Sequence, residues 1–369
     1  MGYTMAEDQV IVYSEEPVDD IWLRLLRFTH QRGLAQHRPR ASGQALDLDA
    51  CAEVTGSCRQ AHEYFKAATS STLATAPLQL YYGMISLLKA ATILVAGHCG
   101  DIGHHGMTIG KIVKEMRIGD VSLTVQGQRA GGLLEYAQVV QPGNGLTGKQ
   151  LWTLRELLGS VPDLFDEHAA AYGPGQEIYS VPFERVVLSD SQSADRIDSA
   201  HGPTILPLIS QIEGFSSRYL APQQLPDGLV ILRPRLKSPG DLAQMALSGR
   251  RFLLVGHKKN QACVTLVPML SIFMGMFILG TLSRYHARRW FDFLGNTQDD
   301  ERNLIESFVR LSIRGFPNMV LDFVSGRKHI FTGLRFQDTD LREFAVTKDV
   351  KEMVSKELSG AIRRLRRQE

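Results

Sequence analysis

The segment from Ala262 to Ser283 carries no charged residue and consists mainly of Leu, Ile, Phe and Met. An apolar run of this length can span a bilayer as a helix. The run also contains Pro268, Gly275 and Gly280, and no second convincing span is evident to pair with it. We therefore expect a helix that other parts of the protein enclose on all sides. A peripheral membrane protein anchored by this segment is the alternative.

Length and composition are those of an ordinary soluble globular protein. The chain has 369 residues, of which 44% are hydrophobic and 22% charged, and its formal net charge is +2. This length exceeds what one hydrophobic core usually holds, so about two lobes are expected. The small net charge gives no global electrostatic reason for binding nucleic acid or acidic lipid, so any such site must be local.

Cysteine usage and the N-terminal residues predict a cytoplasmic protein that is not held in a membrane. The four cysteines show no CxxC spacing, and the chain does not begin with a basic and then apolar secretion signal; the cysteines are Cys51, Cys58, Cys99 and Cys263.

Apolar residues at helical spacing predict helices at both ends of the chain. In the first part they cover residues 18–33, 52–69 and 78–96. Pro77 suits the first turn of the third helix, and Gly97 suits its end. From Pro268 onward, helices are predicted over residues 270–290, 301–313 and 350–367.

The middle of the chain has strand-like alternation interrupted by short helical patterns. Strands are predicted over residues 121–125, 133–140, 178–188, 228–233 and 251–256, and short helices over 151–158, 162–171, 205–213 and 241–247. The predicted fold class is α+β and predominantly α-helical. Its parts are an N-terminal helical part (1–115), a mixed α/β middle (116–260) and a C-terminal helical part (261–369) that packs on the first.

Two groups of residues resemble a known family. Three segments are similar to the N-terminal half of YaaC-like proteins. They are Ala61-His62-Glu63-Tyr64-Phe65, Pro77-Leu78-Gln79-Leu80-Tyr81-Tyr82-Gly83 and His105-Gly106. The later segment Arg284-Tyr285-His286, followed by Arg288-Arg289-Trp290, resembles that family's Arg-Tyr-x-Pro-x-x-Trp signature, with Ala287 in place of the usual proline. YaaC-like proteins are regarded as HEPN-like, so the resemblance implies a helical bundle of N- and C-terminal helices with the strand-rich middle as an insertion.

The densest basic and aromatic group follows the long apolar run, at residues 284–290. Cations there suit the negative pole at a helix C-terminus, which is one interpretation. Guanidinium groups beside stacking rings also bind phosphate-bearing ligands such as a nucleotide or an RNA end. The candidate ligand-binding residues are Tyr81, Tyr82, His104, His105, Arg284, Tyr285, His286, Arg288, Arg289 and Trp290.

Residues 98–105 contain possible metal ligands, but their spacing matches no standard zinc site. They are His98, Cys99, Asp101, His104 and His105. We expect these side chains to be solvated or to form hydrogen bonds within the loop. We predict no metal and no cofactor. Four arginines near the C-terminus, within 363–367, suit a solvated helix end or a contact with nucleic acid or an acidic partner.

Catalytic motifs are sparse. The sequence shows no Walker A motif, no GxGxxG after a strand, no HExxH and no GxSxG. Many HEPN proteins cleave RNA with an Arg-x(4 to 6)-His motif, and five pairs here have that spacing, about twice the number expected by chance. They are Arg24/His30, Arg32/His37, Arg196/His201, Arg250/His257 and Arg251/His257. No arginine stands at this spacing before His104 or His105.

The resemblance implies a catalytically silent binding or regulatory subunit. HEPN-like proteins recur in bacterial antiphage and toxin–antitoxin systems beside an effector enzyme, so we expect a protein partner, self-association or both, with a nucleotide or RNA as possible ligand. A metal-independent HEPN-type ribonuclease that acts as a dimer is the alternative.

Overall fold

A computed structural model describes residues 9–333, except residues 101, 114, 128–130, 144, 174–178, 190–191, 200, 210–211, 213–214, 236–242 and 260–261. Among the described residues, 9–10 and those within 18–329 group into one compact unit, and 11–17 and 330–333 into a second. The predicted C-terminal helix over 350–367 and the arginines within 363–367 lie outside the described residues. The domain boundaries predicted at residues 115 and 260 stay a prediction.

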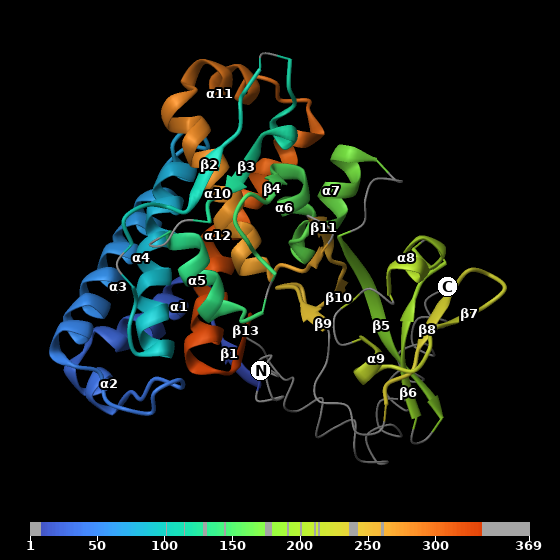
Figure 1. The fold of residues 1–369 in the computed structure, drawn as a ribbon, viewed down its shortest axis with the longest axis horizontal. Helices are drawn as coiled ribbons and strands as arrows, with labels where there is room; N and C mark the ends of the chain where they lie inside the picture. The colour runs from blue at the N-terminus through green and yellow to red at the C-terminus, as the bar shows by residue number, and fades with distance from the viewer. Residues whose placement is uncertain are drawn as a thin grey trace, which may run out of the picture. The chain divides into compact units, whose positions relative to one another are not determined.

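The first unit is predominantly helical (Figure 1). Its helices outside the six-stranded sheet region are α1 (Pro17–Leu26, which begins at the unit boundary), α2 (Gln31–Gln36), α3 (Leu48–Thr69), α4 (Ala76–Ala96), α5 (Gly132–Val140), α6 (Leu154–Gly159), α7 (Phe165–Tyr172), α10 (Pro268–Tyr285), α11 (Ala287–Leu294) and α12 (Asp300–Ser325). Short 3-10 turns are η1 (Arg27–Thr29), η2 (Ile118–Asp120) and η3 (Pro162–Leu164).

Helix α10 is the buried helix that the uncharged run predicts. Fourteen of its 18 residues are buried, and it packs against α4, α6 and α12. Pro268 begins it, which suits proline because a first-turn amide has no intrahelical partner. Gly280 lets α4 approach closely, since a Cβ there would lie 3.4 Å from the Pro77 carbonyl oxygen. The Tyr81 and Phe277 ring centroids are 5.4 Å apart, so these two distant segments are neighbours in the core.

Helix α4 is equally apolar and supplies the other half of this contact. Within the described part of the chain, it is one helix long and apolar enough to cross a membrane, but 72% of its most apolar window is buried inside the protein. It ends at Gly97, whose φ of +93° places it in the left-handed region where glycine is favoured.

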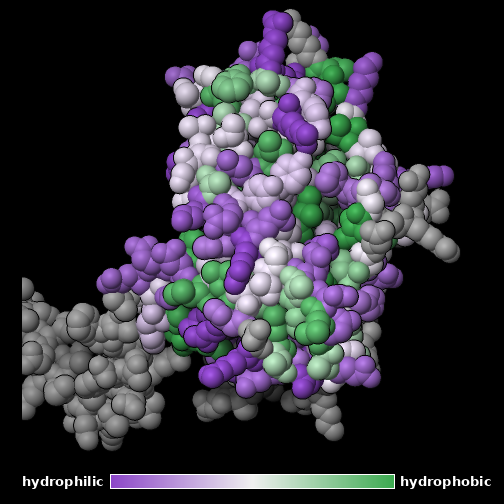
Figure 2. All heavy atoms as spheres, turned by 90° about the vertical axis from the view of Figure 1, so that its left-hand side faces the viewer, coloured by the Kyte–Doolittle hydropathy of each residue, from purple (hydrophilic) through white to green (hydrophobic). Residues whose placement is uncertain are grey.

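Helix α3 covers the opposite side of α4 and keeps a polar outer surface. Asp47 caps it by accepting a hydrogen bond from the Ala50 amide at 2.7 Å. Its buried stripe includes Val54, Ala61 and Phe65. Figure 2 shows the α3 side of the molecule, where polar side chains are interspersed with scattered apolar ones. Scattered apolar residues of this kind are normal on a protein surface.

Helix α12 is longer than the pattern over residues 301–313 predicts. It begins after Asp299, whose carboxylate caps the Glu301 amide, and it continues through Pro317 to Ser325. Proline usually interrupts a helix because it lacks an amide hydrogen, yet α12 continues past Pro317. Burial of Phe316 and Val320 on either side of Pro317 favours the continuous helix here.

Small antiparallel sheets form the strand-rich middle. A three-stranded sheet has the order β2 (Met107–Ile109), β3 (Ser122–Val125), β4 (Leu151–Thr153). A six-stranded sheet has the order β7 (Gln223–Gln224), β8 (Val230–Leu232), β6 (Gln192–Ile197), β5 (Ser180–Ser189), β10 (Arg251–Leu254), β9 (Ala243–Met245). Strands β11 (His257–Lys259) and β12 (Ala262–Val264) form a hairpin, and β1 (Gln9–Tyr13) pairs with β13 (Lys328–Thr332), mostly within the second unit.

The six-stranded sheet has its own apolar core. Two short helices contribute to it, α8 (Gly202–Ile209) and α9 (Phe215–Arg218). The buried side chains come from four strands and these helices, and they include Val181, Phe183, Ile197, Ile205, Ile209, Phe215, Val230, Leu232 and Leu253. The predicted α+β class with a strand-rich middle is therefore confirmed.

Several element predictions are wrong. The helices predicted over 18–33 and 270–290 are each interrupted, at η1 and at His286, and the first three residues of the helix predicted over 151–158 form β4. Residues 133–140 form helix α5 and not a strand, because the buried residues Leu133, Tyr136, Ala137 and Val140 follow the helical spacing of three and four. Strand β3 pairs instead with β2 and β4. The short helix predicted over 241–247 is wrong for the described residues of that range, because Ala243–Met245 are strand β9, which pairs with β10. This segment is a strand because it pairs with β10 at the edge of the sheet. A local sequence pattern does not reveal such a pairing.

Candidate ligand-binding site

An exposed arginine at the end of α10 meets a tyrosine of α4. The Arg284 guanidinium donates a hydrogen bond to the Tyr82 hydroxyl at 2.6 Å, across 202 residues of sequence. Tyr82 stacks on Tyr64 of α3, with ring centroids 5.8 Å apart. The Arg284 charge also lies over the Tyr285 ring, 4.9 Å from its centroid, and that ring is 65% exposed. Cations and aromatic faces therefore alternate on this surface.

The loop before β2 brings two histidines to the same place. The amides of Gly132 and Leu133, at the start of α5, donate to the carbonyl oxygens of His104 and His105 at 2.9 and 3.1 Å. The His105 ring contacts the Tyr81 ring, with centroids 5.4 Å apart, and is exposed on its other side. Helix α5, which the sequence analysis missed, thus fixes the position of both histidines.

Burial and nearby cations keep His105 neutral. Partial burial against Tyr81 is the largest cause that lowers the pKa of His105, followed by His104 and then the positive charge of Arg284. The imidazole is therefore available as a hydrogen-bond acceptor or base at neutral pH.

Helix α11 places the remaining candidates. The Trp290 ring is fully buried, and its Nε1 donates to the Ala74 carbonyl oxygen at 3.0 Å, so it anchors α11 to the turn between α3 and α4. Arg288 is exposed, whereas His286 and Arg289 are half-buried. Among the ten predicted residues, the structure thus groups Tyr81, Tyr82, His104, His105, Arg284 and Tyr285 together, and it sets Trp290 inside the core.

A family comparison covers most of this architecture. A family model described as "YaaC-like Protein" matches residues 24–324, which include α3, α4, the histidine loop, α10 and nearly all of α12. The chain belongs to the YaaC-like family. No curated protein and no solved structure matches the chain significantly.

Two tyrosines of this YaaC-like site are absent from the predicted set. Tyr64 stacks on Tyr82, and its place on a helix face was visible in the apolar spacing of residues 52–69. Tyr136 is buried against Phe273 of α10, with ring centroids 5.9 Å apart. The wrong strand assignment over 133–140 hid Tyr136, although the helical spacing of that segment was the signal that would have revealed it.

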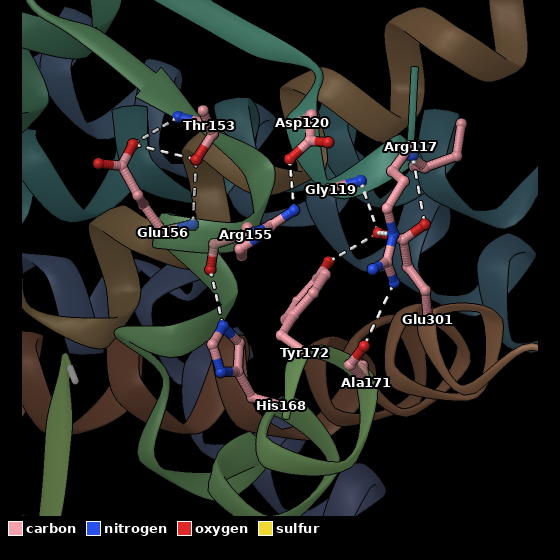
Figure 3. Close-up of polar contacts among 11 residues, drawn as sticks. Arg117, Gly119, Asp120, Thr153, Arg155, Glu156, His168, Ala171, Tyr172 and Glu301 are labelled. Atoms are coloured by element: carbon pink, nitrogen blue, oxygen red, sulfur yellow. Dashed lines mark hydrogen bonds and ion pairs between the residues drawn. The ribbon is translucent and has the colours of Figure 1, made fainter. Parts of the chain in front are cut away.

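The YaaC-like chain also holds a polar network that no sequence motif indicates (Figure 3). The buried Glu301 carboxylate accepts hydrogen bonds from the amides of Ile118 and Gly119 at 3.3 and 2.9 Å and from the Tyr172 hydroxyl at 2.9 Å. Arg117 lies 3.5 Å from the same carboxylate and its guanidinium lies 5.0 Å from the Tyr172 ring centroid. These bonds join η2 and α7 to the start of α12, which is a structural role.

A neighbouring part of this network organises α6. Thr153 and Glu156 form a capping box, and the Glu156 carboxylate also binds Lys259 at 2.6 Å. Arg155 pairs with Asp120 at 2.5 Å, and its carbonyl oxygen contacts the Nε2 atom of His168 at 3.1 Å (Figure 3). These contacts hold η2 and α7 beside α6.

The five Arg/His pairs at ribonuclease spacing do not gather at this site. Arg196 pairs with Glu184 and Arg250 with Asp166, while His201 binds Asp198. His257 is 3% exposed. Among the described residues no group of three or more His, Cys, Asp and Glu side chains has metal-binding geometry; Asp101 lies outside the described residues.

Proposed function

We propose that this YaaC-like chain is a non-catalytic binding or regulatory subunit with a HEPN-like helical bundle, which recognises a phosphate-bearing ligand. The ligand is a nucleotide or an RNA end. One observation carries the proposal: Tyr82, Arg284 and His105, from three separate segments, converge on one exposed surface. The proposal also includes the setting: the protein acts in the cytoplasm, in a bacterial antiphage or toxin–antitoxin type complex with an effector enzyme.

The chemistry of Arg284 supports a phosphate ligand. Its hydrogen bond to Tyr82 fixes the guanidinium of an otherwise exposed side chain, and no ion pair joins it to a carboxylate in the described part of the chain. An arginine fixed by a neutral hydroxyl keeps its full charge for an incoming anion. The exposed ring of Tyr285 offers a face on which a base can stack.

Apolar surface around α11 supports a protein partner or self-association. Phe291 on α11 is 60% exposed, and Tyr285 at the end of α10 is 65% exposed. A hollow of about 480 Å³ lies beside Phe291, between the turn that follows α3 and the start of α12; its lining residues are Thr72, Leu73, Ala74, Phe291, Leu294, Gly295, Arg302 and Glu306. Exposed aromatic side chains beside a hollow are typical of protein interfaces.

Replacing Arg284 and Arg288 together with alanine is expected to weaken the binding of 5′-phosphorylated hexauridine and of ATP by at least roughly tenfold, because the site loses the Arg284 guanidinium and helix α11 loses a second exposed cation. Isothermal titration calorimetry measures the affinities, and circular dichroism checks the fold. Arg310→Ala is the matched control, since Arg310 is an exposed arginine on α12 that pairs with Glu306. Equal binding by the double variant and the control would remove the proposal.

One observation favours the alternative of a HEPN-type ribonuclease. Arg284 lies close enough to His105 to lower its pKa. It could therefore take the role of the motif arginine, which is absent at the required sequence spacing before this histidine. A neutral imidazole next to a guanidinium is suited to proton transfer at an RNA 2′-hydroxyl with charge stabilisation of the phosphate.

If the alternative holds, the purified protein cleaves single-stranded RNA in the presence of EDTA, and His105→Ala slows cleavage by roughly 10²–10⁴-fold. Gel analysis of labelled RNA measures the rate, with His62→Ala as the control for loss of a histidine on α3 that belongs to none of the five Arg/His pairs. The proposed non-catalytic subunit predicts intact RNA for both proteins. Cleavage that survives His105→Ala would contradict both and indicate a contaminating nuclease.

A further inference from the structure

Three buried hydrogen-bond donors without partners lie next to the exposed site. The hydroxyls of Tyr81 and Tyr136 and the Nε2 atom of His104 are buried and have no hydrogen-bond partner among the described residues. Tyr81 is 4% exposed and Tyr136 is 1% exposed. Buried polar atoms are almost always satisfied in native proteins, so three such atoms in one neighbourhood need a reason.

The two tyrosines contact the same ring of α10, and the His104 backbone lies near one of them. The Tyr81 ring stacks on Phe273 with centroids 5.6 Å apart, and the Tyr136 ring meets Phe273 edge-on at 5.9 Å. A Cβ built on Gly132 would lie 3.5 Å from both the Tyr136 ring and the His104 carbonyl oxygen. Tyr81, Tyr136 and His104 therefore belong to one neighbourhood at the junction of α4, α5 and α10.

All three groups are donors at neutral pH. Burial raises the pKa of the Tyr81 and Tyr136 hydroxyls far above their ordinary value, so both keep their protons. The Nδ1 atom of His104 accepts a hydrogen bond from the Gly106 amide at 3.0 Å, so in the neutral ring Nε2 carries the hydrogen. Each of the three groups can donate a hydrogen bond, so together they suit an acceptor with several oxygens; the two hydroxyls can also accept.

These donors lie directly beneath the exposed surface. Tyr81 precedes Tyr82, and its ring contacts His105, which is itself exposed. Arg284 is close enough to influence both Tyr82 and His105. The His105 side chain thus separates the buried donors from the solvent-facing guanidinium.

We propose that Tyr81, Tyr136 and His104 form an inner subsite that binds the terminal phosphate of the ligand, with Arg284 at its entrance. The inference rests on the proposed function and specifies the ligand group it recognises. A phosphate monoester at the end of a chain has three oxygens without a substituent and fits a recess lined by donors. An internal phosphodiester is joined to the chain on both sides, so it is confined to the outer surface.

The test compares isosteric variants that remove one hydroxyl each. Tyr81→Phe and Tyr136→Phe are expected to weaken 5′-phosphorylated hexauridine by about tenfold each, since a hydrogen bond to a charged oxygen is lost. Binding of hexauridine with a 5′-hydroxyl is expected to be weak and equal in all these proteins. ATP as a third probe distinguishes a free nucleotide from an RNA end as the source of the phosphate.

Thermal unfolding supplies the structural control. Removing a hydroxyl that has no partner leaves the melting temperature unchanged or raises it. Tyr219→Phe removes a hydroxyl that donates to Asp195 at 2.7 Å, so it is expected to lower the melting temperature without changing binding.

The outcomes separate this inference from the function on which it rests. If the wild-type protein binds none of the probes, the proposed function fails. If the wild-type protein binds and the Arg284/Arg288 variant does not, while Tyr81→Phe and Tyr136→Phe bind as the wild type does, the inner subsite alone is overturned. Equal affinity for hexauridine with and without its 5′-phosphate would likewise overturn it.

Discussion

Replacing Glu301 with alanine is expected to lower the free energy of unfolding by about 3–5 kcal/mol. The substitution removes the acceptor shared by the amides of Ile118 and Gly119 and by the Tyr172 hydroxyl. Each buried donor left without an acceptor costs about 1–3 kcal/mol. Water cannot easily replace the carboxylate, because Glu301 is 2% exposed. Urea unfolding followed by circular dichroism measures the change.

The matched control is Glu306→Ala on the same helix. Glu306 pairs with Arg302 and Arg310 at the helix surface, where such ion pairs contribute about 0–1 kcal/mol. Glu301→Gln is expected to fall between the two, since the amide oxygen still accepts a hydrogen bond. A loss for Glu301→Ala no larger than that for Glu306→Ala would show that the network does not secure α12.

Acid is expected to destabilise the protein through two buried histidines. Burial lowers the pKa of His257 to about 3 and that of His168 to about 4, whereas both titrate near 6.5 when unfolded. Below pH 6.5 the unfolded state binds protons that the folded state does not, so stability falls as pH falls. At pH 5 each histidine reduces the free energy of unfolding by about 2 kcal/mol, and together by about 4 kcal/mol.

Single variants assign this pH dependence to each ring. Measuring urea unfolding at pH 7.5 and 5.0 for the wild type, His257→Gln and His168→Gln removes the contributions of other groups by difference. Each variant is expected to lose about 2 kcal/mol less than the wild type on acidification. The groups facing His257 are Lys259, which lowers its pKa further, and Glu156, whose carboxylate is 4.0 Å away. If the free energy of unfolding fell equally with pH in all three proteins, the two histidines would not be the cause of the acid destabilisation.

The sequence predicted the helical core well, because continuous apolar spacing leaves few alternatives to a buried helix. The packing of α4 against α10 was predictable because each helix has an apolar surface that must be buried. Two element predictions failed because the choice depended on distant partners: β9 is a strand because β10 lies beside it, and α12 continues through Pro317 because its neighbours are buried. The strand predicted over 133–140 is different, since the helical spacing of α5 is visible in the sequence.

The sequence indicates candidate site residues but not how they are arranged. Tyr82 and Arg284 were both recognised, yet their hydrogen bond joins residues 202 positions apart and follows only from the packing of α10 on α4. Glu301 gave no signal at all, since an acidic residue in the first turn of a helix is common and its partners are 182 and 183 residues away.

The close crossing of α4 and α10 has a consequence for synthesis on the ribosome. Roughly 170 residues separate the end of α4 from the start of α10. At about 5–20 residues per second, the nascent chain carries an incompletely covered apolar helix for about 10–40 s before its partner emerges. During this interval α4 is incompletely buried, so we expect chaperones that bind exposed apolar segments to associate with the nascent chain.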